Sequence, residues 1–408
     1  MAEFKALAAE ATGPLTSVRI LDLTSVVNGA YATQILADQG AEVIKLEDPG
    51  SGRGAGGDIM RWAGHVPEGA PRDLGPIFLA INRNKRSVVL DLKTDEGKAQ
   101  VRSLIETCDV FAASVRYEGL KRLGLGYEDV AAIRPDIIYV HAAGYGSDGP
   151  YAGEPAYDDL IQSASGLADV LPRTDGNPTP RLLPTLVADK VSGLFMSQAI
   201  TAALLHRART GEGQFVEVPM LECVTSFLMV EHLYDHTFDP PIGQWGYPRV
   251  VNPHRKPFAT RDGHIGLLPY TDKQWDQFFE AAGWGETVAK DPRFADYATR
   301  AKHTHELYAL VETVTAGKTT QEWLDLLKPM SIPVVKTNKL DDLETDPHLA
   351  AVGLFERYDH PEAGPYKAMR HPIRFTKSPA NIRRHPPRLG EHTAEVLGEV
   401  LAETDAKA

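Results

Sequence analysis

Cysteine is scarce in this chain of 408 residues, which has only Cys108 and Cys223, both in apolar surroundings. Two thiols do not provide a disulfide framework or a cysteine-based zinc site, so we expect a reducing, cytoplasmic location. Long hydrophobic runs are also missing, because no apolar stretch approaches the ~20 residues that span a bilayer. The first residues lack the basic and apolar regions of a signal peptide. We therefore expect no membrane partner.

An excess of positive charge is missing as well. The chain has 43 Lys and Arg residues against 55 Asp and Glu residues, which gives a formal net charge of -12. This balance argues against general binding of nucleic acid, although it leaves room for a local basic pocket around a small anion.

One basic cluster stands out, because Arg83, Lys85 and Arg86 precede an apolar strand and Lys93 follows it. Charges at a strand edge are usually solvated. The alternative is a binding site for phosphate groups, in which lysine acts as a point charge and arginine forms bidentate hydrogen bonds. In an acidic protein such a cluster favours a small phosphorylated ligand over a polymer.

Two further motifs have a plain explanation. GRGAGG at 52–57 matches a dinucleotide-binding pattern, but Pro49 follows the strand and no clear helix comes directly after the glycines, so a loop is favoured. His303 and His305 of the HTHE tract point away from each other on a helix, and we expect no metal site there.

Strand and helix patterns alternate through the first 150 residues. The predicted strands are SVRILDLTS, AEVIKLE, SVVLDL, DVFAAS and IIYVHAAGYG, with helices at 28–40 and 94–108. Such alternation predicts a doubly wound α/β fold around a parallel sheet. Farther on, three amphipathic helices predict a smaller α-rich domain over roughly 235–330. IPVVKT at 332–337 then returns to strand character, and a final helix begins at about 393.

Asp189 lies where an apolar run stops and a long helix starts. A carboxylate at that place gains from the free N–H groups and the positive end of the helix dipole. The plain interpretation is a helix N-cap, and the other is a reactive carboxylate. The residues alone leave both open.

Ordered motifs along nearly the whole chain resemble the family III CoA-transferases. This CaiB/BaiF group includes formyl-CoA and carnitine CoA-transferases. The motifs are LADQGAEVIKLEDPGSG (36–52), NRNKRSVVLDLKTDEGK (82–98), RLGLGYEDV (122–130), GYGSDGPYAGEPAYDDLIQSASG (144–166), RTGEGQFVEV (209–218), DPHLAAVGLF (346–355) and PPRLGEHTAEVL (386–397).

The resemblance implies a fold of two domains. A Rossmann-like large domain would be built from both chain ends, over residues 1–225 and 331–408. A smaller, α-rich domain with its linkers, 226–330, would be inserted into it. Two subunits would thread through each other as an interlocked homodimer.

The resemblance also implies that Asp189 is the nucleophile. Its carboxylate would form an acyl-aspartyl anhydride and then an enzyme–CoA thioester, which is covalent catalysis. Coenzyme A or acyl-CoA and a carboxylic acid would be substrates, with no permanently bound cofactor and no metal.

The family's CoA contacts, carried over residue by residue, fall on ten positions. They are Val27, Asn28, Leu90, Lys93, Ser114, Val115, Arg116, Arg122, Ala156 and Tyr157. Where some members have an arginine, this chain has Asp48, which cannot bind phosphate, so Lys85, Arg86 or Lys93 would have to compensate. The family's mobile glycine loop corresponds to Gly243–Gly246.

The acid substrate is less defined by the sequence. Val27 stands where formyl-CoA transferase carries a glutamine, which argues against oxalate or formate. We expect a short organic acid, with succinyl-CoA as the candidate donor. Arg249, His254 and Arg255 are candidates to bind the acid, although basicity of the linker explains them as well.

Two alternatives stay open. The same fold hosts α-methylacyl-CoA racemases, whose histidine aligns with Tyr157, followed by Asp158. A tyrosine, with an ordinary pKa near ~10, is a poor base at neutral pH, and this favours transfer over racemisation. The other alternative is a catalytically silent acyl-CoA-binding relative, in which Asp189 only caps its helix.

Overall fold

The protein is described by a computed structural model that covers residues 4–50 and 55–405. Of the GRGAGG loop, Gly52 and Gly54 lie outside these described residues. The chain forms two compact units. The first is built from 1–165, 183–227 and 348–408, and the second from 166–182 and 228–347.

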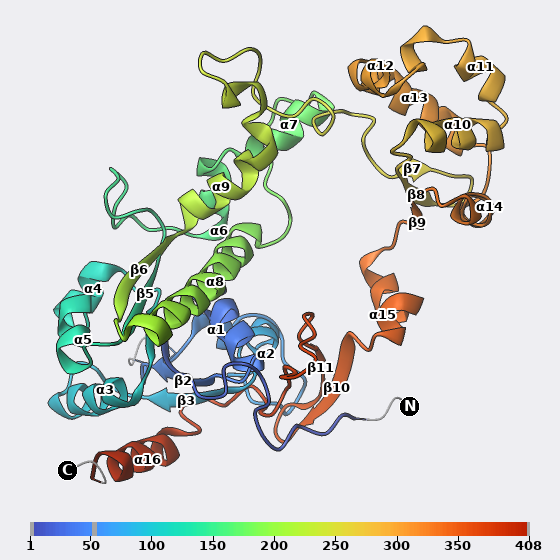
Figure 1. Cartoon of the computed structure of the whole chain (residues 1–408). Coiled ribbons are helices and arrows are strands. Elements are labelled where there is room, and N and C mark those ends of the chain that lie inside the picture. The colour runs from blue at the N-terminus through green and yellow to red at the C-terminus, as the bar shows by residue number, and fades with distance from the viewer. Residues whose placement is uncertain (1–3, 51–54, 406–408) are drawn as a thin grey trace. The chain divides into compact units, whose positions relative to one another are not determined.

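The first unit is organised around a six-stranded sheet whose strands are all parallel (Figure 1). The spatial order is β3-β2-β1-β4-β5-β6, and it reverses between β1 and β4. This order is that of a doubly wound, Rossmann-like fold, so the predicted α/β class is confirmed. The strands are β1 (Arg19–Leu23), β2 (Glu42–Glu47), β3 (Lys85–Val89), β4 (Val110–Ala113), β5 (Ile138–Ala143) and β6 (Gln214–Pro219).

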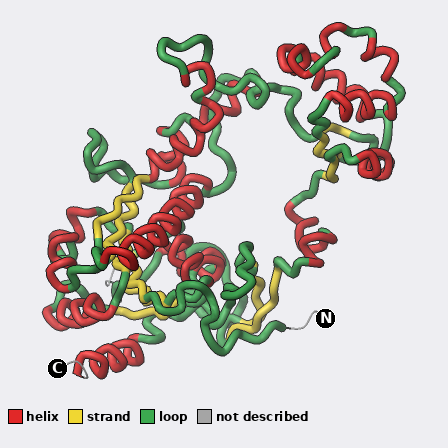
Figure 2. The backbone as a smooth tube through the Cα atoms, viewed as in Figure 1, coloured by secondary structure: helices red, strands yellow, loops and turns green. Residues whose placement is uncertain are grey.

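Helices cover both faces of this sheet, because alternate residues of each strand point to opposite sides. Ile20 faces α1 (Asn28–Asp38) and α8 (Val187–Thr210). Leu21 faces the other layer, formed by α3 (Asp95–Thr107), α5 (Tyr127–Ile133) and α16 (Thr393–Asp405). Figure 2 shows the strands flanked by these helices. The chain also contains α2 (Pro76–Ile81), α4 (Tyr117–Arg122), α6 (Asp158–Ala164), α7 (Val170–Asp175), α9 (Met220–His232) and α15 (Pro347–Ala351), of which α7 belongs to the second unit.

The sequence pattern missed one hairpin of the first unit. Strands β10 (Phe355–His360) and β11 (Gly364–Met369) pair in antiparallel fashion, in a segment for which the sequence analysis predicted no strand. The buried Tyr358 of β10 packs with Ala368 of β11 and with Ile382. Many proline and histidine residues near this segment obscured the alternation of strand side chains.

The second unit is predominantly helical, with its own apolar core around Phe278, Val311 and Trp323. The three amphipathic helices are α10 (Asp272–Ala281), α13 (Thr304–Thr315) and α14 (Thr320–Leu327). The shorter elements are α11 (Gly285–Ala289), α12 (Tyr297–Lys302), β7 (Phe258–Ala259), β8 (His264–Leu267) and β9 (Val334–Lys336).

The predicted strand within IPVVKT exists as β9, but its place is not in the large sheet. It pairs antiparallel with β8 of the second unit, with Val334 opposite Leu267. The domain limits 1–225, 226–330 and 331–408 stay predictions. In the described part of the chain, no helix is both long and apolar enough to cross a membrane.

Candidate functional site

A cavity of about 1170 Å³ lies at the carboxyl ends of the parallel strands in the first unit. Ser25 follows β1 and Ser114 follows β4, so the cavity spans the point where the strand order reverses. Open α/β sheets bind ligands at this point, because the loops on either side diverge there. Gly144 after β5, Met220 after β6 and Asp189 of α8 complete the wall.

Asp189 occupies the first turn of α8, but it is not the N-cap. The cap position is Leu186, so Asp189 is the third residue of the helix. Its residue surface is only 7% exposed. No side chain of the described residues donates a hydrogen bond to its carboxylate. The interpretation of Asp189 as a cap is therefore wrong, and the carboxylate is left without a structural partner.

A second carboxylate, Asp158, lies against the start of the same helix. The Asp189 N–H donates to Asp158 Oδ1 at 3.1 Å, and Gln162 Nε2 donates to Asp158 Oδ2 at 2.6 Å. Burial, and then the charge of Asp158, raise the pKa of Asp189 to about 7. The helix terminus is expected to keep Asp189 ionised, but burial and the Asp158 charge oppose its ionisation near neutral pH.

The α1 helix packs closely against the first turns of α8. A Cβ on Gly193 would stand 2.7 Å from the Asn28 carbonyl oxygen, so only glycine permits this approach. Asn28 Nδ2 donates to Ser192 Oγ at 2.7 Å, and Ser192 Oγ donates to the Ala188 carbonyl at 2.6 Å. The wall formed by Asn28 is thus fixed to the turn that carries Asp189.

Basic side chains of α4, and of Arg116 just before it, line the cavity. Arg116 and Arg122 both line it, and neither forms an ion pair with any described residue. Lys121 also lines it, but its Nζ pairs with Glu118 at 2.9 Å. Two unpaired guanidinium groups provide a fitting environment for phosphate oxygens.

Comparison with known proteins decides the family. The family model of CoA-transferase family III matches residues 15–393. This chain belongs to CoA-transferase family III. Such enzymes use CoA thioesters as substrates, so the chain is a CoA-transferase and acyl-CoA is its substrate class.

Relatives of this CoA-transferase include the succinate–glutarate CoA-transferase of Agrobacterium fabrum, 33% identical over 95% of this chain and 96% of the relative. The succinyl-CoA:glutarate CoA-transferase of Mus musculus is also 33% identical, over 95% of this chain and 86% of the relative. A solved CAIB/BAIF family protein from Brucella suis has a TM-score of 0.78 and 30% identity, covering 95% of this chain and 100% of that one.

The expected phosphate role of Lys85 and Arg86 is wrong for this CoA-transferase. Lys85 is fully buried, its Nζ lies 3.1 Å from Asp22 Oδ2, and burial lowers its pKa to about 8. Arg86 is almost as buried and pairs with Glu42 and with Glu399, the latter at 2.7 Å. Neither side chain has a free face for phosphate, and neither is solvated.

The other predicted CoA contacts divide into two groups. Those that line the cavity with Asp189 are Asn28, Ser114, Arg116, Arg122, Ala156 and Tyr157. Those outside the lining are Val27, Leu90, Lys93 and Val115. The side chains of Val27 and Leu90 are buried in apolar clusters, so any contact with CoA would use their backbone. Lys93 and Val115 are exposed, and so is Asp48.

An aromatic wall of the cavity escaped the sequence analysis. Tyr117 of α4 lies with its ring 5.7 Å from Phe215 of β6 and 5.3 Å from His141 of β5. Tyr127 lies 5.6 Å from Phe215. His141 Nε2 lies 3.0 Å from the Val115 carbonyl, and burial lowers its pKa, so the ring is neutral. The alternation of side chains along β5 and β6 could have indicated that His141 and Phe215 lie on one face of the sheet.

The remaining candidates belong to the second unit. Gly246 N donates to the His232 carbonyl at 2.9 Å, and a Cβ on Gly243 would clash with Asp235. Arg249 Nε donates to the Tyr308 hydroxyl, and His254 pairs with Glu312 at 3.0 Å. Arg255 is exposed. Their roles toward the substrate stay predictions.

The HTHE tract offers no metal geometry. His303 pairs with Glu306, and the His305 ring packs against His254 at 4.6 Å. Among residues 4–50 and 55–405, no cluster of three or more His, Cys, Asp or Glu side chains could hold a metal ion.

Proposed function

We propose that this CoA-transferase moves CoA from a donor acyl-CoA to a short organic acid, with Asp189 as the nucleophile. The observation that carries the proposal is the buried Asp189 carboxylate, which lines the cavity and receives no hydrogen bond from any side chain within residues 4–50 and 55–405. A structural aspartate would be hydrogen-bonded or paired at this depth. A desolvated carboxylate at a cavity wall is instead available to attack a carbonyl carbon.

The reaction begins when an Asp189 oxygen attacks the thioester carbonyl and CoA leaves as a thiolate. The product is a mixed anhydride between the acyl group and Asp189. The thiolate then attacks the Asp189 carbonyl carbon, and the first acid leaves as a carboxylate. Asp189 now holds CoA as a thioester, which conserves the energy of the original bond.

The acceptor acid runs the same steps in reverse. Its carboxylate attacks the Asp189–CoA thioester, which releases the thiolate and forms a second anhydride. Thiolate attack on the acceptor's acyl carbon gives the new acyl-CoA and restores the Asp189 carboxylate. No net proton is consumed. Water must stay out, because hydrolysis of any intermediate would waste the thioester.

The cavity supports binding of the whole CoA ester. Arg116 and Arg122 line the cavity without an ion pair to any described residue, so we propose that they, and not Lys85 and Arg86, bind the CoA phosphates. Succinyl-CoA is the proposed donor and a short dicarboxylate the proposed acceptor. The Agrobacterium relative is named a succinate–glutarate CoA-transferase and the mouse relative a succinyl-CoA:glutarate CoA-transferase, and these names support this choice. We also propose an interlocked homodimer, with Gly243–Gly246 as its mobile glycine loop.

Chemical trapping tests the nucleophile. Wild-type protein incubated with succinyl-CoA and hydroxylamine should acquire a hydroxamate on Asp189, visible as a mass shift in its peptide. Asp189→Ala should abolish both the hydroxamate and CoA exchange, while it still binds CoA. Exchange by Asp189→Ala at the wild-type rate would overturn the assignment. A wild-type protein that binds CoA without exchange or trapping would be the silent relative.

Racemisation requires a separate experiment, since it leaves no enzyme-bound thioester. Tyr157, at the position of the racemase histidine, lies with 64% of its surface exposed at the cavity. We expect no exchange of the α-hydrogen of a 2-methylacyl-CoA with deuterated water when no acid acceptor is present. Rapid deuterium incorporation would favour the racemase.

A further inference from the structure

The turn after β1 forms part of the cavity wall and has an unusual backbone. Ser25, Val26 and Asn28 all line the cavity. Val26 has a φ of 64°, in the left-handed region. A β-branched residue is a genuine outlier there, because its branched Cβ crowds the backbone. Such a conformation persists only where surrounding contacts determine it.

Side chains from β1, β2 and the residue after β4 fix successive backbone groups of this turn. The Thr24 N–H donates to Asp22 Oδ1 at 2.9 Å, and the Thr24 carbonyl accepts from Lys45 Nζ at 2.8 Å. The next N–H, of Ser25, donates to the Ser114 hydroxyl at 3.0 Å. These three hydrogen bonds hold the backbone as far as Ser25. The conformation of Val26 depends on one further hydrogen-bond partner.

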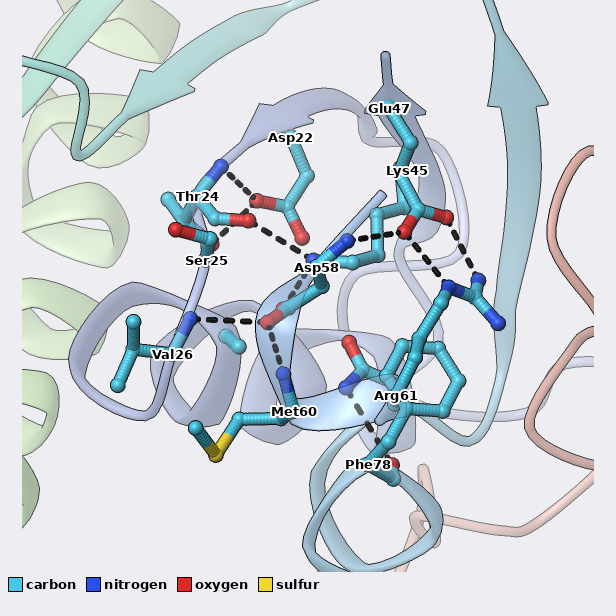
Figure 3. A network of polar contacts seen from close by, with 12 residues as sticks. Asp22, Thr24, Ser25, Val26, Lys45, Glu47, Asp58, Met60, Arg61 and Phe78 are labelled. Atoms are coloured by element: carbon cyan, nitrogen blue, oxygen red, sulfur yellow. Dashed lines mark hydrogen bonds and ion pairs between the residues drawn. The ribbon is translucent and has the colours of Figure 1, made fainter. Parts of the chain in front are cut away.

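That partner is Asp58, which is 2% exposed. Its Oδ1 accepts from the Val26 N–H at 3.1 Å and from the Met60 N–H at 3.0 Å, and its Oδ2 lies 2.9 Å from Lys45 Nζ (Figure 3). Lys45 therefore bridges two points of the turn, directly at Thr24 and through Asp58 at Val26.

Asp58 is itself held by a second buried pair. Its N–H donates to Glu47 Oε1 at 2.9 Å. Glu47 binds Arg61 in a fork, with distances of 2.8 and 2.6 Å, and the Arg61 guanidinium stacks on Phe78 (Figure 3). Because every charge in this network has a partner, Asp58 is a rigid support for Val26.

We propose that Asp58 is a positioning residue for CoA-ester binding, which holds Val26 in its left-handed conformation and so shapes the cavity wall from Ser25 to Asn28. The inference rests on the proposed use of this cavity for the CoA ester. Asp58 does not itself line the cavity, so its effect must pass through the Val26 backbone.

Removal of the carboxylate tests the proposal. Asp58→Ala should weaken binding of CoA at least about fivefold by calorimetry, because the released Val26 relaxes from the strained conformation and shifts the wall. Asp38→Ala is the matched control. Asp38 is 1% exposed, pairs with Arg83 at 2.6 Å, and lies outside the cavity lining. It should lose stability and retain CoA binding within about twofold.

A second substitution separates positioning from general destabilisation. Glycine adopts the left-handed conformation without strain, so adding Val26→Gly to Asp58→Ala should recover at least about half of the lost affinity in logarithmic terms. Equal CoA affinity in the Asp58 and Asp38 variants, or no recovery with glycine, would overturn the proposal.

If Asp58→Ala does not fold, Asp58→Asn remains informative, because its amide oxygen can still accept from the Val26 N–H. CoA binding within about twofold of wild type supports positioning through that bond, and a loss above about fivefold contradicts it. Binding of CoA needs no chemistry at Asp189. Failure of the trapping experiment on Asp189 would therefore leave this test unaffected, and the two results can be distinguished.

Discussion

Asp158 accepts a hydrogen bond from the backbone N–H of Asp189 at 3.1 Å, and this contact brings two buried carboxylates to the start of one helix. The N–H bond holds the chain of α8 in place, while the neighbouring charge opposes ionisation of Asp189. The same residue thus positions the proposed nucleophile and tunes its protonation, which leads to the first prediction.

The rate of transfer should fall on the acid side of neutrality. The attacking carboxylate must be ionised, and burial followed by the Asp158 charge raises the pKa of Asp189 to about 7. A plot of kcat/KM for acyl-CoA against pH should therefore rise to a plateau with an apparent pKa near 7. Asp158→Asn should move this limb to lower pH, because it removes the charge and keeps an oxygen for the Asp189 N–H. The exposed neighbour provides a control, since Asp159→Asn should leave the profile unchanged. An Asp158→Asn profile identical to wild type would contradict the coupling.

The raised pKa of Asp189 also predicts a dependence of stability on pH. The folded protein binds the Asp189 proton more tightly than the unfolded chain, so this proton stabilises the fold at low pH. The contribution is lost as the pH rises through about 7. The free energy of unfolding of Asp189→Asn minus that of wild type should therefore increase from pH 5 to pH 8, by on the order of 1–3 kcal/mol. Denaturant unfolding at the two pH values measures the difference, with Asp159→Asn as the reference. If the stability difference between Asp189→Asn and wild type were the same at both pH values, a raised pKa of Asp189 would be contradicted.

Affinity for CoA should depend on the unpaired arginines of the cavity. Arg116→Ala and Arg122→Ala should each weaken CoA binding about tenfold, because a charge-assisted contact to phosphate is lost. Lys93→Ala is the comparison, since Lys93 is exposed and lies outside the cavity lining, and it should change affinity less than about twofold. The arginine effects should shrink at high salt as screening weakens phosphate contacts. If Lys93→Ala lost more CoA affinity than either arginine variant, the prediction would be contradicted, and the phosphates would instead bind near Lys93, after β3.

Much of the fold could be predicted because its signals are local. The strands of the large sheet carry apolar residues toward both faces, and the helix at 95–107 begins with a Thr94 hydroxyl that accepts from the Gly97 N–H. Such features involve residues close in sequence. The pairing of IPVVKT was missed because strand character does not specify which sheet a strand joins.

The environment of charged residues could not be predicted in the same way. Lys85 and Asp22 are 63 positions apart, and they meet only because β3, β2 and β1 are neighbours in the sheet. Asp158 and Asp189 are 31 positions apart and meet through the packing of α6 on α8. The sequence indicated Asp189 by its place at a helix start. Its burial, its second carboxylate and the strained Val26 depend on tertiary contacts.

The helix α16 bears on how the first unit is made in the cell. Its Val396 and Val400 are buried in the apolar cluster that also contains residues of α3 and β3. Glu395 and Glu399 of the same helix pair with Arg86. During translation α3 and α5 are made early, whereas the part of this layer that α16 covers is completed only when about residue 400 has left the ribosome. The apolar cluster on this side of the sheet is therefore completed last by α16, which follows every strand of the sheet in the chain.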